Sequence, residues 1–483
     1  MRLTFIGHQS WHIHAGVTNV LVDPLLGEGI GNSGRIVLPI FPPRTVHTQR
    51  MSPPDLVVLT HEHPDHFDLA SLSQLDPATR VVVGPTLPSF VCEAIEALGL
   101  TCRVAAWQEP MRIGALEMRL YPAGRRTPAW EDRVAQPLFS TPESTGPRLF
   151  VAADATVSEL LLADVKRGRA PSPNWVVVSN NSQIPPSPAY DNLLAGSRWD
   201  RTRFADALPL LSLLAGELTA GLKDVADIVL CGNGFLDPRQ RFGPFLFSDH
   251  PTLAAAAAAL RCGGPRLHGP IPGDVLDLTG DRPPARADWV EPDGEGRLRL
   301  LAQQQAFLTS TDGLQPMRPV LADNDGPAGR AAVEAVVDGA LPGLARAILA
   351  APLGHALALT HEHLGRSLDA RRFVLRLLRS EATTKQYALD LRLGSFVRDD
   401  CPSGELLSRF PFGAELFLCD LAAVLTGDLQ AWDIAGVALR SWHLGDPRTA
   451  FTPLLFHSYG EHVRPDLARR ALEPTLARLA ARK

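Results

Sequence analysis

The sequence predicts a two-domain protein, with an α/β domain over residues 1–295 and an α+β domain over residues 296–483. The chain of 483 residues is longer than one ordinary domain, since a domain usually holds about 100–200 residues. Short apolar runs alternate with helical segments in the first part, which is typical of α/β folds. A stretch rich in Pro, Gly and Asp, residues 280–296, then precedes a part of different character.

The expected strands of the first domain are short and mostly apolar, as in buried sheets. Several of them run directly into polar residues. We expect strands at Leu3–Gly7, Asn19–Asp23, Asp55–Thr60, Val81–Gly84, Arg103–Trp107, Leu116–Pro122, Arg148–Ala153, Trp175–Ser179 and Asp227–Cys231, and helices at Ser89–Ala97, Val157–Asp164 and Arg203–Asp224.

The second domain combines helical and strand patterns. Residues Ala331–Leu349 and Leu368–Leu378 are rich in Ala, Leu and Arg and are predicted to form amphipathic helices. Residues Tyr387–Val397 alternate between apolar and polar and are predicted to form a strand, and Glu415–Leu418 is a second strand candidate.

The composition favours a globular protein and argues against nucleic acid as a partner. Hydrophobic residues make up 45% of the chain and the formal net charge is only −5. No basic block of nucleic-acid size is present. The apolar run Leu253–Leu260 is too short to span a bilayer, so no membrane contact is expected. Positive charges are mostly Arg, which suggests a GC-rich bacterial genome.

The six cysteines are scattered and form no C-x-x-C pair. This pattern excludes a zinc ribbon and a Rieske cluster. Separate thiols in a long chain indicate a reducing compartment, and the N-terminus lacks the layout of a signal peptide. The sequence therefore predicts a cytoplasmic location.

The stretch Thr60–His66, here named the His loop, is the strongest chemical signal in the chain. It reads Thr-His-Glu-His-Pro-Asp-His and follows an apolar run expected to be a buried strand. Imidazole and carboxylate groups are common ligands of divalent metals, and a strand end gives them a rigid base. We therefore predict a metal site here.

Four donors within six residues cannot all reach one ion, so we expect the His loop to serve two. His61 and His63 would face one metal, while Asp65 and His66 face the other. Two metals at such sites lie roughly 3.5–4 Å apart and share a bridging group. Asp154, at the end of a later strand, is the natural bridging carboxylate. Asp65 and Asp154 are thus also the candidate catalytic residues.

These segments resemble the metallo-β-lactamase superfamily, whose motifs occur in the same order. The residues that carry the resemblance are Leu3–His8, Val20–Pro24, the His loop and Phe150–Asp154. The branch resembled contains CMP-N-acetylneuraminate hydroxylase and ascorbate-6-phosphate lactonase. The resemblance covers about the first 280 residues and implies an αββα sandwich with metals at one edge. It also implies that Asp23 is structural and that His8 lines the site.

The second half carries a weaker resemblance. Ser248–Pro251 and Pro272–Leu278 resemble late segments of the sialic acid hydroxylase, and the region around Phe410–Leu439 looks like a sterol-carrier-type α+β fold. A second Thr-His-Glu-His, at Thr360–His363, lacks the following Asp-His and is interpreted as unrelated to metal.

The sequence departs from the family pattern at two ligand positions. Where the family has a histidine after the strand Leu116–Pro122, this chain has Gly124, and where it has its last histidine, this chain has Gly232-Asn-Gly. Glycine cannot bind metal through a side chain. His250 is the first candidate to replace a missing ligand, and His268 is the alternative.

These losses favour iron over zinc, because open positions and a carboxylate-rich remainder suit oxygen chemistry. The leading hypothesis is an O2-dependent hydroxylase with two divalent metal ions, acting on a polar small molecule and supplied by an external electron-transfer protein. The alternative is a zinc-dependent hydrolase of a lactone, ester or phosphodiester. A non-catalytic binding module is the third possibility.

Several polar residues could bind such a substrate. Most follow the strand Trp175–Ser179, which should end near the metals, although Asn is also common in turns. Arg125 would bind a carboxylate or phosphate. The substrate-binding candidates are Asn180, Asn181, Gln183, Tyr190 and Arg125.

Overall fold

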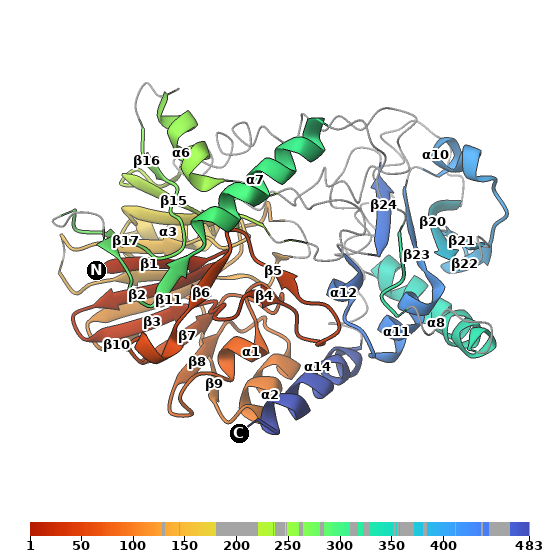
Figure 1. Ribbon diagram of the computed structural model, residues 1–483, viewed down its shortest axis with the longest axis horizontal. Helices are drawn as coiled ribbons and strands as arrows, with labels where there is room; N and C mark the ends of the chain where they lie inside the picture. The colour runs from red at the N-terminus through yellow and green to blue at the C-terminus, as the bar shows by residue number, and fades with distance from the viewer. Residues whose placement is uncertain are drawn as a thin grey trace.

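The computed structural model shows two sheets stacked face to face, with helices on both outer faces (Figure 1). This arrangement confirms the expected αββα sandwich. The structure describes residues 1–127, 131–143, 145–179, 221–234, 236, 247, 249–259, 264–280, 285–309, 317–321, 329–350, 354, 357, 371–379, 384–410, 412–435, 438–443 and 464–482.

The first sheet begins with antiparallel strands and continues with parallel ones from β3 onward. Parallel strands place their carboxyl ends at one edge, and the His loop leaves that edge after β7. In spatial order the strands are β18 (Ala285–Arg286), β17 (Asp274–Asp277), β1 (Arg2–Gly7), β2 (Ser10–Ala15), β3 (Thr18–Val22), β7 (Leu56–Leu59), β8 (Arg80–Val83) and β9 (Thr101–Val104).

The second sheet is also antiparallel at one side and parallel at the other, from β13 onward. Asp154 follows the carboxyl end of β13, so both sheets send polar residues to the same edge of the sandwich. The strand order is β10 (Met111–Ile113), β11 (Leu116–Pro122), β12 (Ala135–Ser140), β13 (Arg148–Val151), β14 (Trp175–Ser179), β15 (Asp227–Cys231) and β16 (Arg266–His268).

Three apolar layers hold the sandwich together. Side chains such as Phe5, Trp11 and Phe139 fill the space between the sheets. Helices α1 (Leu69–Leu72) and α2 (Ser89–Ala97) cover the first sheet. Helices α3 (Glu159–Lys166) and α6 (His250–Ala259) lie over the second. A helix whose apolar residues recur at helical spacing buries one face in this way.

The remainder of the chain forms a separate sheet with its own helices, named here the C-terminal unit (Figure 1). The boundary near residue 295 and the sterol-carrier likeness stay predictions. The strand order is β22 (Ser395–Arg398), β21 (Thr384–Asp390), β20 (Arg371–Leu378), β23 (Phe412–Phe417) and β24 (Leu439–His443); the helices are α8 (Arg330–Ala350), α10 (Leu406–Arg409), α11 (Leu418–Thr426), α12 (Ala431–Ala435) and α14 (Pro465–Ala480). Helix α7 (Gly294–Thr309) lies instead against the sandwich (Figure 1), where its Arg297 pairs with Asp249 beside α6.

The helix expected at Leu368–Leu378 is wrong, because the structure has strand β20 from Arg371 to Leu378. β20 is central and pairs with β21 on one side and β23 on the other. Phe373, Leu375 and Leu377 enter the main core cluster, at the two-residue period of a strand. Sheet pairing thus outweighs the local helix propensity of Leu and Arg.

The strand expected at Tyr387–Val397 is interrupted, since β21 ends at Asp390 and a turn precedes β22. Most of the helix expected at Arg203–Asp224 lies outside the described residues, as does the second Thr-His-Glu-His at Thr360–His363.

Contacts of the described residues join the C-terminal unit to the sandwich at several places. The hairpin of β4 (Gly29–Ile30) and β5 (Leu38–Pro39) places apolar side chains in the same cluster as the C-terminal sheet. Helix α14 returns to lie beside α1 and α2 (Figure 1), where Leu472 and Leu479 enter their core. Within residues 1–295, a further short sheet pairs β6 (Arg44–Val46) with β19 (Val290–Pro292). The two halves therefore share buried surface.

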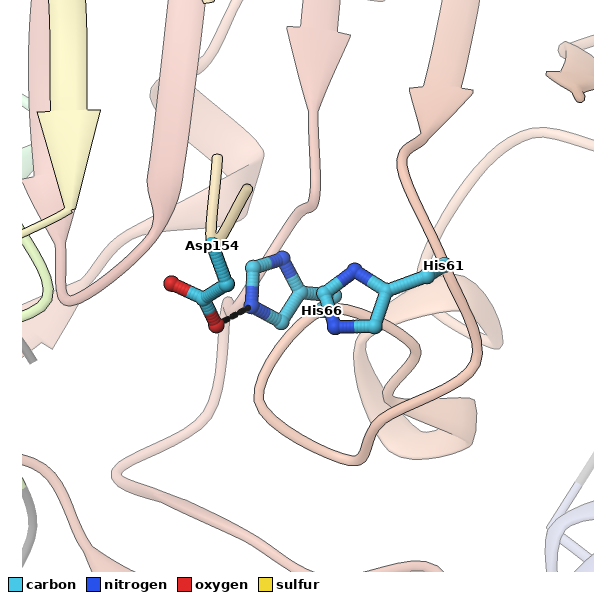
Figure 2. Close-up of side chains that lie close together, drawn as sticks. All are labelled: His61, His66 and Asp154. Atoms are coloured by element: carbon cyan, nitrogen blue, oxygen red, sulfur yellow. Dashed lines mark hydrogen bonds and ion pairs between the residues drawn. The ribbon is translucent and has the colours of Figure 1, made fainter. Parts of the chain in front are cut away.

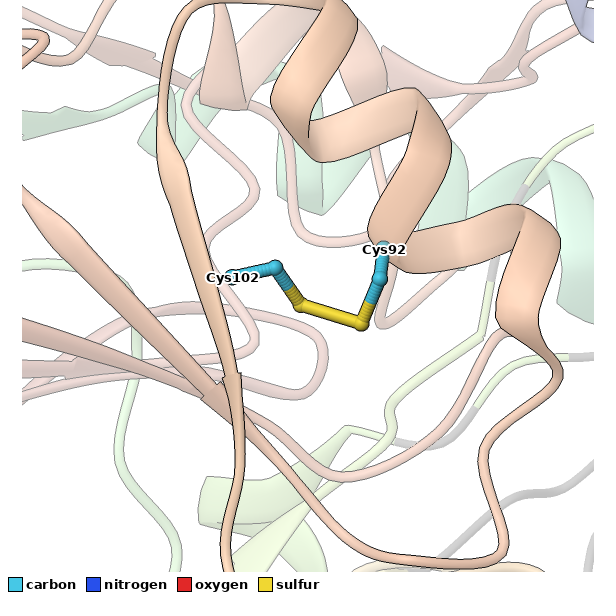
Figure 3. The surroundings of a disulfide bond; sticks show 2 residues. All are labelled: Cys92 and Cys102. Carbon is cyan, nitrogen blue, oxygen red and sulfur yellow. A yellow bond between two sulfur atoms is a disulfide. The ribbon is translucent and has the colours of Figure 1, made fainter.

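Cys92 of α2 and Cys102 of β9 are joined by a disulfide (Figure 3). The sequence pattern had predicted separate thiols at these positions. The α2–β9 connection brings their Cα atoms to 5.4 Å, within the range of bridged cysteines. Among the residues that the structure describes, no helix is long and apolar enough to cross a bilayer.

Candidate metal centre

Asp23 fixes the conformation of the His loop where the loop leaves β7, because it binds Thr60, the first residue of the loop. Asp23 accepts hydrogen bonds from the Thr60 backbone N–H and hydroxyl, each at 2.7 Å. It also receives Nδ1–H of His66 at 2.7 Å. Asp23 is fully buried and takes a left-handed φ of 46°. Burial raises the pKa of its carboxyl, although His66 and Thr60 oppose this.

Hydrogen bonds to Thr60 and Asp23 also select which ring nitrogens face the centre. The Thr60 hydroxyl donates to Asp23, so it accepts from Nδ1–H of His61 at 3.0 Å and leaves Nε2 of His61 as the metal-facing atom. His66 donates Nδ1–H to Asp23, so its Nε2 faces the centre. Such support of a ligand histidine by a buried carboxylate is common at metal sites.

Three donor atoms converge in the first donor group, which comprises His61, His63 and Glu131. Nε2 of His61 lies 2.9 Å from Nδ1 of His63 and 3.2 Å from Oε2 of Glu131. Nδ1 of His63 lies 3.4 Å from the same oxygen. The Glu131 side chain is 12% exposed. The group offers two imidazole nitrogens and one carboxylate oxygen.

The second donor group comprises His66, Asp154 and Asp65. Nε2 of His66 lies 3.0 Å from Oδ2 of Asp154 and 3.5 Å from Oδ2 of Asp65. Figure 2 shows the Asp154 carboxylate pointing at His66, with the ring of His61 beside it. Ligand atoms of His61, His66 and Asp154 lie within 4.8 Å of one another, so His61 links the two groups. Asp65 is further held by Nε2 of His8 at 2.9 Å.

The electrostatics of both groups favour a bound cation. Burial alone would lower the pKa of His66, but Asp65, Asp23 and Asp154 raise it well above its usual value. Burial lowers the pKa of His61 well below its usual value, so its ring is neutral. Burial also raises the pKa of Glu131 to about 7, with His63 opposing. Negative potential and neutral imidazole at short range are what a divalent ion requires.

Glu131 was missed from the sequence, where the ligand was sought at position 124. In the structure Gly124 is packed so tightly that an added Cβ would lie 2.4 Å from the carbonyl oxygen of Val157. Glu131 instead precedes β12, whose first residue Ala135 donates its N–H to the Thr60 carbonyl at 2.9 Å. An acidic residue just before this apolar strand was the available signal.

The candidate replacement ligands lie outside both donor groups. His250 is fully buried at the start of α6, and neither ring nitrogen has a hydrogen-bond partner among the described residues. Burial lowers its pKa to about 3, with a smaller effect of His8. His268 instead bonds Asp227 at 2.7 Å. A ligand role for His250 stays a prediction.

The substrate-binding residues are placed only in part. Arg125 lies on an exposed turn, where its backbone N–H donates to Glu159 at 3.1 Å. The other candidates, Asn180, Asn181, Gln183 and Tyr190, lie outside the described residues.

The C-terminal unit reaches the His loop through α12. The ring of Trp432 meets His63 edge-on, with centroids 4.9 Å apart. Next to it, Ser33 donates to the buried Asp433 at 2.7 Å and ties α12 to the sandwich. A mostly apolar cavity lies behind the loop, lined by Glu62, Phe67, Phe90, Val424, Leu429, Gln430, Ala431, Trp432, Leu467 and Ala468.

A family model and a curated relative match parts of this chain. Residues 18–167 match the family model described as β-lactamase superfamily domain. A curated relative, a UPF0173 metal-dependent hydrolase of Aeropyrum pernix, is 28% identical over 95 residues, which is 20% of this chain and 34% of the relative. The chain therefore spans about a third of that relative's length.

Solved structures with a similar arrangement include two enzymes of different chemistry. An isothiocyanate hydrolase from Delia radicum gut bacteria is 15% identical, with a TM-score of 0.38 over 57% of this chain and 99% of that one. CmlA, a diiron β-hydroxylase from Streptomyces venezuelae, is 17% identical, with a TM-score of 0.38 over 59% of this chain and 54% of that one.

Proposed function

We propose that this chain, whose residues 18–167 belong to the metallo-β-lactamase superfamily, is an enzyme that holds two divalent metal ions and uses O2 to hydroxylate a polar small molecule. The observation that carries the proposal is the meeting of His61, His63 and Glu131 in one buried group. A carboxylate completes this group where zinc sites commonly use a third histidine.

The donor set supports iron as the preferred metal and zinc as the alternative. The two donor groups together offer three imidazoles and the carboxylates of Asp65, Glu131 and Asp154. Mixed histidine and carboxylate ligands with open positions are typical of non-haem iron oxygenases. When bound, iron would supply the redox chemistry that reaction with O2 requires.

The chain's own residues orient the site and manage protons. Asp23 and Thr60 fix the tautomers of His66 and His61, so that their Nε2 atoms face the centre. Asp154 lies beside His66 and would be the carboxylate shared by the two groups. Asp65, held by His8, can accept or return a proton at the reacting substrate.

Hydroxylation requires reducing equivalents from outside the chain. One oxygen atom of O2 enters the substrate and the other becomes water, which consumes two electrons and two protons. The sequence holds no C-x-x-C pair and no Rieske pattern that would bind an electron-transfer cluster. We therefore propose an external electron-transfer protein as partner. We also propose a cytoplasmic location, as the sequence predicts, although the Cys92–Cys102 disulfide removes two of the thiols on which that prediction rests.

Hydrolysis of a lactone, ester or phosphodiester is the second candidate. It is supported by the name of the curated relative, a metal-dependent hydrolase. Here zinc would occupy both donor groups, and Asp65 would orient the attacking water.

Metal content and turnover separate these candidates. The protein is purified without chelator, and its metals are measured by inductively coupled plasma mass spectrometry and Mössbauer spectroscopy. About two spin-coupled irons per chain, with reductant-dependent O2 uptake, are expected. About two zincs with ester hydrolysis and no O2 uptake would establish the hydrolase instead. Absence of any metal would leave a binding module and refute both.

A matched pair of variants tests the decisive residue. Glu131→His supplies the missing imidazole and should shift the metal preference toward zinc. Glu143→His is the control, because Glu143 lies on an exposed turn. An unchanged iron-to-zinc preference in Glu131→His would remove the main support for iron.

A further inference from the structure

Gln9 connects the first sheet to three strand ends of the second. It lies in the turn between β1 and β2, after His8, whose φ of 54° is left-handed. The side chain is buried. Its three partners, Asp154, Ser179 and Cys231, follow or end the neighbouring parallel strands β13, β14 and β15.

Each polar atom of the Gln9 amide has a partner. Nε2 donates to Oδ1 of Asp154 at 2.8 Å and to Oγ of Ser179 at 2.7 Å. Oε1 accepts from the thiol of Cys231 at 2.9 Å. The carboxylate requires a donor, so it sets the amide orientation: with the amide turned over, oxygen would face oxygen.

We propose that Gln9 is a positioning residue that holds Oδ1 of Asp154 and leaves Oδ2 for the metal centre. Oδ2 is the oxygen that lies 3.0 Å from Nε2 of His66. Without the amide, the Asp154 carboxylate could rotate and present either oxygen. Ser179 and Cys231, which belong to the second sheet, in turn fix the amide of Gln9, which belongs to the first sheet. The Asp154 carboxylate is therefore held by contacts between the two sheets.

A neutral amide suits this role better than a charged group. A Lys or Arg in this place would pair with Asp154 and lower its affinity for a cation, whereas a carboxylate would repel it. The amide donates one hydrogen bond to Asp154 and leaves the charge of the carboxylate available. This inference rests on the proposed function, because it assumes that metal binds beside Asp154.

Cobalt(II) titration tests the inference without any need for activity. Gln9→Met keeps the length of the side chain but cannot donate. We expect its affinity for cobalt to fall about 10- to 100-fold, as for other residues that support metal ligands, with a changed visible d–d spectrum. Ser179→Ala, which loosens the amide, should change both in the same direction by less.

Gln386→Leu is the matched control. Gln386 is also a buried amide that donates to a carboxylate, Asp399, at 3.1 Å, but it lies in the C-terminal unit. Its variant should leave cobalt affinity and spectrum unchanged. Equal losses in Gln9→Met and Gln386→Leu, or an unchanged Gln9→Met and Ser179→Ala, would overturn the inference. If the unaltered protein binds no cobalt, the proposed function itself fails.

Discussion

Buried carboxylates occur both at the His loop and in the C-terminal unit, but different groups face them. At the His loop, Asp154 and Glu131 face imidazole nitrogens of His66, His61 and His63. In the C-terminal unit, Asp420 accepts hydrogen bonds from the backbone N–H groups of two residues in a neighbouring segment, Val320 and Leu321, at 2.9–3.0 Å. Asp433 accepts from Gln430 N–H and from the Ser33 hydroxyl.

The hydrogen-bond partners of these carboxylates distinguish the structural cluster in the C-terminal unit from the candidate metal-binding cluster at the His loop. A backbone N–H always carries its proton, so it satisfies a buried carboxylate permanently. The unprotonated nitrogen of a neutral imidazole and a carboxylate oxygen are both acceptors, so a proton or a metal ion must lie between them. Convergence of such pairs is therefore the better sign of a metal site than burial of acidic groups alone.

The largest expected effect is the loss of metal when one donor residue of the His loop is removed. His63→Ala deletes one of the two imidazoles of the first donor group. We expect one metal equivalent to be lost, as measured by mass spectrometry of the purified protein. His47→Ala is the control, because His47 faces the exposed Glu291 and no donor group. Full metal content in His63→Ala would show that the first donor group is misassigned.

Removal of Asp420 should affect stability and leave the metal unchanged. Asp420→Ala removes the buried acceptor of two backbone N–H groups, those of the half-buried Val320 and Leu321, at about 1–3 kcal/mol each. We expect the free energy of unfolding, from urea denaturation, to fall by about 4 kcal/mol. Metal content of the folded fraction should stay the same, and its loss would show that the two clusters are coupled.

Local patterns explain why part of the centre was predictable. The four donors of the His loop lie within six residues and follow a strand that the sequence marks clearly, and Asp154 directly follows another. The position of each of these residues is set by the strand that it follows. The parallel strands of the two mixed sheets, whose carboxyl ends lie at the same edge of the sandwich, then bring them together.

Other parts of the centre depend on contacts between distant segments. Glu131 reaches His61 only because β12 pairs its first residue with Thr60. Gln9 meets Ser179 and Cys231 across 170 and 222 positions. β20 was mistaken for a helix because pairing with β21, the next strand, and with the more distant β23 decides its conformation. One sequence contains no signal for such pairings.

The stability that Asp433 of the C-terminal unit contributes should depend on pH. Burial raises the pKa of Asp433 to about 6, although Ser33 and Gln430 oppose this through hydrogen bonds. The folded state thus keeps the proton where the unfolded chain, with the ordinary aspartate pKa of 3.8, has lost it. The contribution to stability is complete below about pH 4 and is lost as the pH rises to about 6.

Asp433→Asn should remove this pH dependence. The shift spans about two pH units, each worth about 1.4 kcal/mol, so the variant should gain about 3 kcal/mol relative to the unaltered protein between pH 4 and pH 6. Urea denaturation at each pH measures this difference. Asp400→Asn is the control, since the Asp400 side chain is 92% exposed. A constant difference across the pH range would contradict the raised pKa.

The smallest expected effect lies where the two regions touch, at Trp432 and His63. An edge-on aromatic pair contributes about 1 kcal/mol beyond its buried area, and here it restrains a donor histidine through a residue of the C-terminal unit. Trp432→Leu should therefore weaken cobalt binding about fivefold, and Trp432→Phe should restore most of it. Trp289→Leu is the matched control, because Trp289 meets His12 edge-on at 5.6 Å, outside both donor groups. If Trp432→Leu and Trp289→Leu bind cobalt as the unaltered protein does, the C-terminal unit supports the fold alone. A loss confined to Trp432→Leu and reversed by phenylalanine would show that it also tunes the metal centre.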